Sequence, residues 1–307
     1  MEIQKIKYYV LLLFTICISC VEPLAVTELP KGVRSLQKSM VGHLSGAIEF
    51  PQGHRIASRW SKEDKILTCK YLNNIISQLT LIPENQHYNM PNLNPGVDLV
   101  FEPYKGVNIY TVLPATVESD EYIVLGAHYD TGNRNVPGAI DNATGMTLIY
   151  TVTRELSKMK HRNKHVILVF FDQEEEELIG SSAFARLLLR KDYNVHSVHT
   201  FDMVGWDGDH NKEVELEMPA PFLEKIYAKH AQQLGIPIYT TQITSTDHYA
   251  FIKKGFDAVG VSQAYAKRDN SGKKDTPEDT YDIVNFDYLQ STTQLAYKVL
   301  QELVTTK

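Results

Sequence analysis

The residues of this chain that are best suited to chemistry are histidine and acidic side chains placed directly after apolar runs. Three successive runs each end this way, at His128 and Asp130, at Glu174 and Glu175, and at Asp202. Any one of them alone is weak evidence for a functional site, because a lone histidine or a single aspartate after a strand is usually structural. Together, imidazole nitrogens and carboxylate oxygens suit a borderline cation such as zinc.

Two further candidates fall in segments without a strand pattern. Asp141 lies within the glycine-bounded segment 138–145, and His248 follows Asp247. A carboxylate that bridges two ions about 3.5 to 4 Å apart lets both ions act on one water and one carbonyl. The combined set therefore indicates a hydrolase.

The acidic run 174–177 shows how such residues are positioned. The six residues before Asp172 are all apolar, which is typical of a strand buried on both faces of a parallel sheet. Ligands of open α/β sheets collect at the carboxyl ends of such strands. We expect Glu174 and Glu175 to act at this edge, and Glu176 and Glu177 to be solvated surface residues.

The remaining pattern alternates between helices and strands. Residues 83–96 hold several prolines and asparagines and are expected to be a loop. Strands are expected at 97–101 and 107–113, as a hairpin, and at 122–127, 165–171, 196–201, 238–241 and 258–261. Helices are expected near 62–80, 144–158, 182–190, 219–234, 247–254 and 285–304. The order predicts an α/β fold with a central, mostly parallel mixed sheet flanked by helices, in a single domain over 61–307.

The N-terminus has the composition of a targeting segment. Lys5 and Lys7 precede a short apolar run, and Ser19-Cys20 resembles a bacterial lipoprotein cleavage box, although Cys17 stands where that box usually has leucine. We expect residues 1–19 to be a signal peptide and 20–60 a tether and loosely structured arm. The protein is expected to be exported to the cell envelope with a lipid anchor at Cys20. Periplasmic or ordinary secretion, and an uncleaved membrane anchor, remain alternatives.

Composition excludes some classes of protein. The net charge of −6 and the isoelectric point near 6.0 give no basic surface for nucleic acid. With Cys17 and Cys20 in the targeting segment, Cys69 is left alone, so no disulfide framework is expected. The other histidines, His43, His54, His87, His161, His199 and His210, are expected at the surface.

At five segments in order the sequence resembles the co-catalytic di-zinc aminopeptidases of the bacterial leucyl aminopeptidase type. Their superfamily also contains glutamate carboxypeptidase II and the glutaminyl cyclases. The segments are Gly126 to Asp130, Gly138 to Gly145, Phe171 to Ser181, Phe201 to Gly205 and Asp247 to Phe251. The resemblance implies the zinc-exopeptidase fold and two zinc ions per chain. It also implies peptide substrates with a free N-terminus.

The resemblance also implies a role for each residue. Asp141 would bridge the ions, and the peptide bond after it would be cis. His128 and Glu175 would bind one ion, while Asp202 and His248 would bind the other. Glu174 would be the general base. Outside the ligands, Asp130 and Asp247 would act from the second shell, Asp130 by orienting the imidazole of His128. Residues that could line the substrate pocket are Tyr129, Trp206, Tyr249, Phe251 and Tyr265.

One departure from the relatives affects the last ligand. Many relatives have a histidine before a Thr-Pro-Glu-Asp-Thr segment, and the corresponding segment here, residues 275–280, comes without that histidine. His248 is then the expected ligand. Two other functions stay open: a glutaminyl cyclase with a single zinc, and a surface binding protein that keeps the fold without catalysis.

Overall fold

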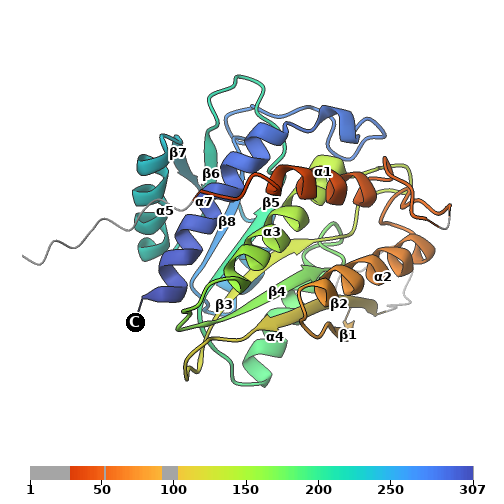
Figure 1. Cartoon of the computed structure of the whole chain (residues 1–307). Helices are drawn as coiled ribbons and strands as arrows, with labels where there is room; N and C mark the ends of the chain where they lie inside the picture. The colour runs from red at the N-terminus through yellow and green to blue at the C-terminus, as the bar shows by residue number, and fades with distance from the viewer. Residues whose placement is uncertain (1–27, 52, 92–102, 307) are drawn as a thin grey trace, which may run out of the picture.

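A computed structural model describes residues 28–51, 53–91 and 103–306, in which one eight-stranded sheet is covered by helices on both faces (Figure 1). The strands are β1 (Glu84–Met90), β2 (Tyr104–Leu113), β3 (Glu121–His128), β4 (His165–Phe171), β5 (Asn194–Asp202), β6 (Val214–Glu217), β7 (Ile238–Thr241) and β8 (Ala258–Gln263). The α-helices are α1 (Val33–Leu44), α2 (Lys62–Gln78), α3 (Gly145–Ser157), α4 (Ile179–Arg190), α5 (Pro221–Leu234), α6 (His248–Ile252) and α7 (Phe286–Thr305). A kinked turn, η1 (Ala139–Thr144), whose backbone is not helical at Asp141 and Asn142, precedes α3. A 3₁₀ turn, η2 (Tyr281–Ile283), precedes α7.

The middle of the sheet is parallel and its margins are mixed. In the order β1-β2-β4-β3-β5-β8-β6-β7, the strands β4, β3, β5 and β8 pair in parallel, as do β6 and β7. The other three pairs are antiparallel. Because the four central strands run the same way, their carboxyl ends meet at one edge, where His128 lies opposite Phe171. The α/β fold with a mixed sheet is as predicted.

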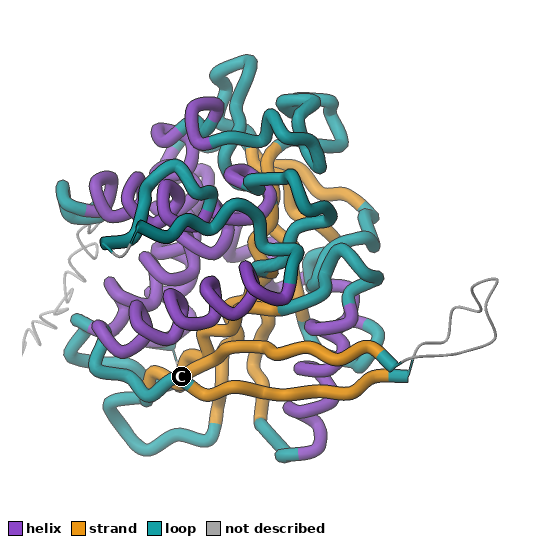
Figure 2. The backbone as a smooth tube through the Cα atoms, turned by 90° about the vertical axis from the view of Figure 1, so that its right-hand side faces the viewer, coloured by secondary structure: helices purple, strands orange, loops and turns teal. Residues whose placement is uncertain are grey.

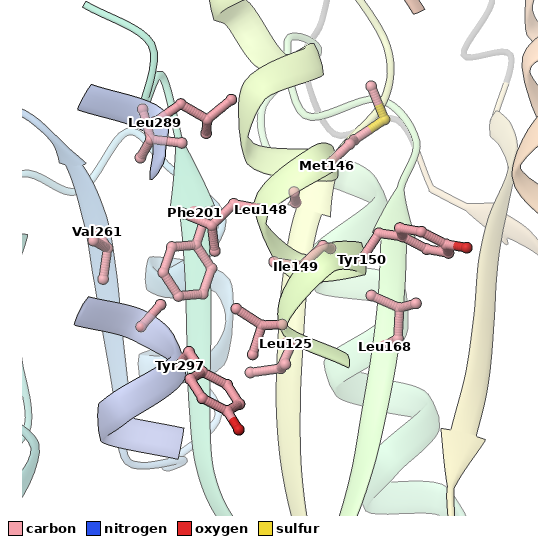
Figure 3. Close-up of a cluster of buried hydrophobic side chains, with 14 of the residues drawn as sticks. Leu125, Met146, Leu148, Ile149, Tyr150, Leu168, Phe201, Val261, Leu289 and Tyr297 are labelled. Carbon is pink, nitrogen blue, oxygen red and sulfur yellow. The ribbon is translucent and has the colours of Figure 1, made fainter. Parts of the chain in front are cut away.

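Side chains of the central strands alternate between two cores. On β4, Leu168 and Phe170 face the side covered by α1, α2, α3, α5 and α7, while Ile167, Val169 and Phe171 face α4 and α6. Figure 3 shows the larger core between α3, α7 and the sheet, and Figure 2 views the sheet from its side. Both cores are mainly apolar, although β5 carries the buried polar residues Ser197, His199 and Thr200. The acidic side chains of the central strands lie at the strand ends.

The structure differs from the predicted elements at the first edge of the sheet. Residues 84–90, expected to be loop, form β1, which pairs antiparallel with β2 (Figure 2). The expected strand 97–101 lies outside the described residues. Among the described strands, β2 pairs with β1 and β4. The sequence of β1 is polar because the strand lies at an edge and is largely exposed. The short strand β6 was also not predicted.

The described part of the N-terminal arm is not loose. Residues 33–44 form α1, which lies against α3, α7 and η1 (Figure 1). Val33, Met40 and Leu44 of this helix are buried in the larger core. The signal segment, Cys17 and Cys20 lie outside the described residues. Within those residues, no helix combines the length and apolar character that a membrane span needs.

Candidate metal centre

Three of the predicted ligands come together at the carboxyl edge of the sheet. Nε2 of His128, at the end of β3, lies 3.1 Å from Oδ1 of Asp141 and 3.3 Å from Oδ1 of Asp202, at the end of β5. All three side chains are buried. Each offers a ligand atom within 4.8 Å of the others. Asp202 therefore lies beside His128, which the resemblance assigned to the other ion.

The two glutamates after β4 lie beside this group. Oε2 of Glu174 is 3.9 Å from Nε2 of His128, and Glu174 and Glu175 both offer oxygens within reach of that histidine. The carboxylate of Asp130 accepts hydrogen bonds from the backbone N–H groups of Glu174 and Glu175, and it lies 3.5 Å from Nδ1 of His128. Asp130 thus fixes the relative position of the histidine and both glutamates.

Asp141 is positioned by groups from distant parts of the chain. The carboxylate of Asp279 accepts hydrogen bonds from the backbone N–H groups of Ile140 and Asp141, at 2.9 and 3.0 Å. The side chain of Asn142 donates to the carbonyl oxygen of Phe201 on β5, at 2.9 Å. The Asp141–Asn142 peptide bond is cis, as the resemblance implied.

Arg59 holds the same segment from the N-terminal side. Its guanidinium is fully buried and donates to the carbonyl oxygens of Leu44, Tyr129, Pro137, Gly138 and Asp141. Gly138 has a φ of 62°, and a Cβ there would collide with the guanidinium, so this turn requires glycine. No sequence pattern marked Arg59 or Asp279 as part of the site.

His248 is not brought to this group. Its Nδ1 lies 3.3 Å from Oε2 of Glu217 and 2.8 Å from Oγ1 of Thr246, and its Nε2 lies 3.1 Å from the carbonyl oxygen of Ile243. Burial lowers the pKa of His248 to about 4 and raises that of Glu217 to about 8, so both are mostly neutral at neutral pH. Among the described residues, His248 belongs to none of the groups of ligand atoms that could hold an ion. The prediction of His248 as a ligand is therefore not supported by its position.

The carboxylates repel each other and are shielded from water. Burial raises the pKa of Glu174 well above its ordinary range, and burial together with the charge of Asp141 raises that of Glu175 to about 8. Burial alone would lower the pKa of His128, but Glu174, Asp202 and other carboxylates outweigh it and raise this pKa. Burial raises the pKa of Asp247 to about 7, and the charges of His128, Asp202 and Asp130 also act on it.

A divalent cation fits the first group of ligands. Oδ1 of Asp141 has no hydrogen-bond donor among the described residues, although it is buried and faces Nε2 of His128. Nε2 of His128 and Oδ1 of Asp141 both carry lone pairs, so at this distance a proton or a cation must lie between them. One imidazole with two carboxylates is a zinc donor set.

The ligand atoms available to a second ion are less suitable. Asp141, Glu175 and Asp275 offer oxygens within 4.8 Å of one another, but Nζ of Lys274 already lies 2.7 Å from Oδ2 of Asp141. Burial opposes ionisation of Asp141, yet Lys274 and His128 together hold its pKa below the ordinary value. The residues present do not fit a second zinc ion as they fit the first.

A cavity of about 530 Å³ opens beside the glutamates. It is lined by Glu174, Glu175, Asp202, Lys274 and two of the predicted pocket residues, Tyr249 and Tyr265. The other three lie elsewhere: Tyr129 donates to the Val107 carbonyl oxygen, Phe251 packs on Phe171, and Trp206 donates to Asp269. Glu176 and Glu177 are exposed, as expected.

Comparison with known proteins identifies a family whose pattern covers this site. The profile of the family described as Peptidase family M28 matches residues 108–300, a range that includes His128, Asp141 and Asp202. A leucine aminopeptidase 2 of Trichophyton rubrum is 32% identical over 158 residues, which are 47% of this chain and 31% of that protein. The match therefore spans about a third of the relative's length.

Solved structures share the fold over nearly the whole chain. BSAP, a zinc aminopeptidase from Bacillus subtilis, is similar with a TM-score of 0.77 at 16% identity, covering 91% of this chain and 97% of that chain. The glutaminyl cyclase of Porphyromonas gingivalis is similar with a TM-score of 0.73 at 18% identity, covering 91% of this chain and 100% of that chain. At such identities the likeness shows the fold alone. The reaction has to be inferred from the residues of the site.

Proposed function

The chain belongs to peptidase family M28, and we propose that it is an exported zinc-dependent aminopeptidase that hydrolyses the first bond of peptides with a free N-terminus. The observation that carries the proposal is the convergence of His128, Asp141 and Asp202 beside Glu174. Aminopeptidases among its relatives support the same choice.

Zinc would be held by the imidazole of His128 and the carboxylates of Asp141 and Asp202. When bound, it would supply Lewis-acid chemistry, polarising a peptide carbonyl and making a nearby water easier to deprotonate. Asp130 keeps the imidazole in place from its other nitrogen. Asp279 and Arg59 keep Asp141 in place through the backbone.

Glu174 is suited to moving the proton. It is buried and lines the cavity, and its backbone N–H donates to Asp130 at 3.0 Å, which fixes the backbone from which the carboxylate reaches the cavity. A carboxylate there can take a proton from the attacking water and pass it to the leaving amine, which is general acid–base catalysis. Its neighbour Glu175 points to the group formed with Asp141 and Asp275.

The cavity has oxygen atoms suited to the end of a peptide. Besides Glu174, its walls include the carboxyl groups of Glu175, Asp202 and Glu217, whose oxygens can accept hydrogen bonds from the ammonium group of a free N-terminus. Leu178, Met203, Ile243, Tyr249 and Tyr265 add apolar and aromatic surface for the first side chain.

The test is a Glu174→Gln variant, with Glu177→Gln as the control because Glu177 lines the same cavity but is exposed. Removing a general base slows catalysis by about 10² to 10⁴-fold. We expect Glu174→Gln to retain zinc and lose hydrolysis of aminoacyl p-nitroanilides to this extent, while Glu177→Gln keeps both. A chelator should abolish wild-type turnover and zinc should restore it. Hydrolysis by Glu174→Gln at the wild-type rate would reject the assigned role.

A second candidate is cyclisation of N-terminal glutamine. The specific observation in its favour is that, within the described part of the chain, the group of His128, Asp141 and Asp202 suits zinc better than the others do. A glutaminyl cyclase needs a single ion. The same purified protein is therefore assayed with glutaminyl and with leucyl peptides. Release of ammonia from glutaminyl peptides without peptide-bond cleavage would favour the cyclase. A protein that binds no zinc would instead support a binding role without catalysis.

Localisation is proposed from residues 1–19 and Cys20 alone. The lysines, the apolar run and the Ser19-Cys20 pair support export to the cell envelope with a lipid anchor on Cys20. Periplasmic release or secretion is the alternative. Peptides reaching that compartment would be the substrates, and nucleic acid is not an expected partner at a net charge of −6.

A further inference from the structure

The ammonium group of Lys274 occupies one side of the carboxylate that would bridge two ions. Oδ1 of Asp141 faces His128, and Oδ2 lies 2.7 Å from Nζ of Lys274. A bridging carboxylate gives one oxygen to each of two cations. In this chain one of the two positions is already filled by a cation that belongs to the protein.

The surroundings of Lys274 favour a fixed positive charge. Asp141, Asp202 and Glu175 all act on the ammonium group electrostatically, and its side chain is only 33% exposed. An ion pair between buried groups is stable when further charges of the right sign surround it. A metal ion entering at Oδ2 of Asp141 would have to displace this ammonium group or bind next to it against charge repulsion.

The other donors at this position do not compensate. Glu175 and Asp275 are carboxylates, so with Asp141 the set contains three oxygens and no imidazole or thiolate. Asp275 is exposed and has a φ of 59°. All-oxygen sets suit calcium or magnesium, whereas zinc sites usually include nitrogen or sulfur ligands. The second position therefore lacks the nitrogen or sulfur ligands that zinc prefers, and the charge of Asp141 there is already neutralised by Lys274.

We propose that Lys274 takes the place of a second metal ion, so that the chain binds one zinc ion, through His128, Asp141 and Asp202. The inference rests on the proposed zinc-dependent function and replaces the two ions that the resemblance implied. Since Lys274 also lines the cavity, its charge faces the substrate. The second positive charge of the site is thus supplied by a side chain and does not depend on metal supply.

The experiment counts zinc in the full chain. Wild-type protein is loaded with excess zinc, desalted and analysed by mass spectrometry of the metal, and zinc binding is also titrated against a chelating dye. We expect one ion per chain and a single binding phase. Lys274→Met should bind about two ions, the second more weakly, because the position at Asp141 is vacated. Lys274→Arg keeps the cation and should bind one.

Lys253→Met is the matched control. Lys253 lines the same cavity and loses the same charge, but it lies over the ring of Tyr249 and not at Asp141. It should bind one ion. Circular dichroism establishes that each variant is folded. If Lys274→Met does not fold, Lys274→Gln takes its place in the same measurements.

The outcomes separate this inference from the proposed function. Two ions in the wild-type chain would overturn the inference and leave the function intact. One ion in both the wild type and folded Lys274→Met would overturn the role of Lys274. No zinc in the wild type would overturn both, whereas one ion in the wild type and two in Lys274→Met supports the inference.

Discussion

His199 should make the stability of the chain fall as the solution becomes acidic. The side chain lies on β5 with 0% of its surface exposed, and burial, with a smaller effect of His196, lowers its pKa to about 3. Its two ring nitrogens lie 3.1 Å from the hydroxyl groups of Ser197 and Tyr227. The folded chain therefore keeps this imidazole neutral at a pH where an exposed histidine takes up a proton.

The sign and size of the effect follow from proton linkage. Histidine in an unfolded chain has a pKa of about 6.5, so between about pH 6.5 and 3 the unfolded state binds more protons than the folded state. The stabilising contribution is complete above that range and is lost as the pH falls through it. Between about pH 7.5 and pH 5 the loss is about 2 kcal/mol.

The assay is urea unfolding of the wild type and His199→Gln at these two pH values. A chelator is present throughout, because metal affinity depends on pH by itself. The variant should be less stable at neutral pH, but its loss of unfolding free energy on acidification should be smaller than that of the wild type by about 2 kcal/mol. His87→Gln removes an exposed imidazole from β1 and should behave as the wild type. An equal loss in the wild type and His199→Gln would refute the reasoning.

Two further predictions concern Arg59 and the N-terminus. Arg59→Met should lower the free energy of unfolding by about 3 to 5 kcal/mol and weaken zinc binding, because buried carbonyl oxygens around Asp141 lose their donor. Urea unfolding and zinc titration measure both effects, with Arg55→Met, at an exposed arginine, as the control. Wild-type values in Arg59→Met would contradict the reasoning. Cys20→Ala should abolish labelling of the exported protein by radioactive palmitate and release it from membranes, whereas Cys17→Ala should not, and a labelled Cys20→Ala protein would contradict the anchor.

The residues that sequence predicted best are those whose position depends only on the strands. His128, Glu174 and Asp202 follow apolar runs, and parallel pairing necessarily brings the ends of such runs to one edge. Their mutual proximity therefore follows from strand order and register, without knowledge of the loops. The same reasoning explains why the parallel centre of the sheet was predicted while its polar edge strand β1 was not.

The neighbours of His248 could not be read from sequence. The motif places residue 248 near the site, but the direction of the imidazole depends on Glu217, at the end of β6. That strand has only four residues and gave no pattern long enough to detect. The partner that holds the imidazole is therefore not apparent in the sequence, and the ligand role of His248 stays a prediction.

The sequence of α1 has helical spacing of its buried residues, but a polar residue interrupts the apolar pattern. Its buried residues Val33, Gln37, Met40 and Leu44 are spaced by three or four, as on one face of a helix. Gln37 interrupts the apolar series, although its amide donates to Thr293 on α7 inside the core, at 2.8 Å. A polar residue satisfied by a distant partner cannot be recognised from its own segment.

The number of ions a carboxylate cluster can hold depends on the cations the protein already places around it. Asp172, next to the cluster, pairs with Lys65 at 2.7 Å, and Asp141 pairs with Lys274 at the same distance. Arg59 adds a third buried charge behind the loop. None of these three cations belongs to the motifs that carry the family resemblance, so the motifs define which carboxylates gather. The positive side chains contributed from α2, the N-terminal arm and the segment before η2 decide how much charge is left for metal to neutralise.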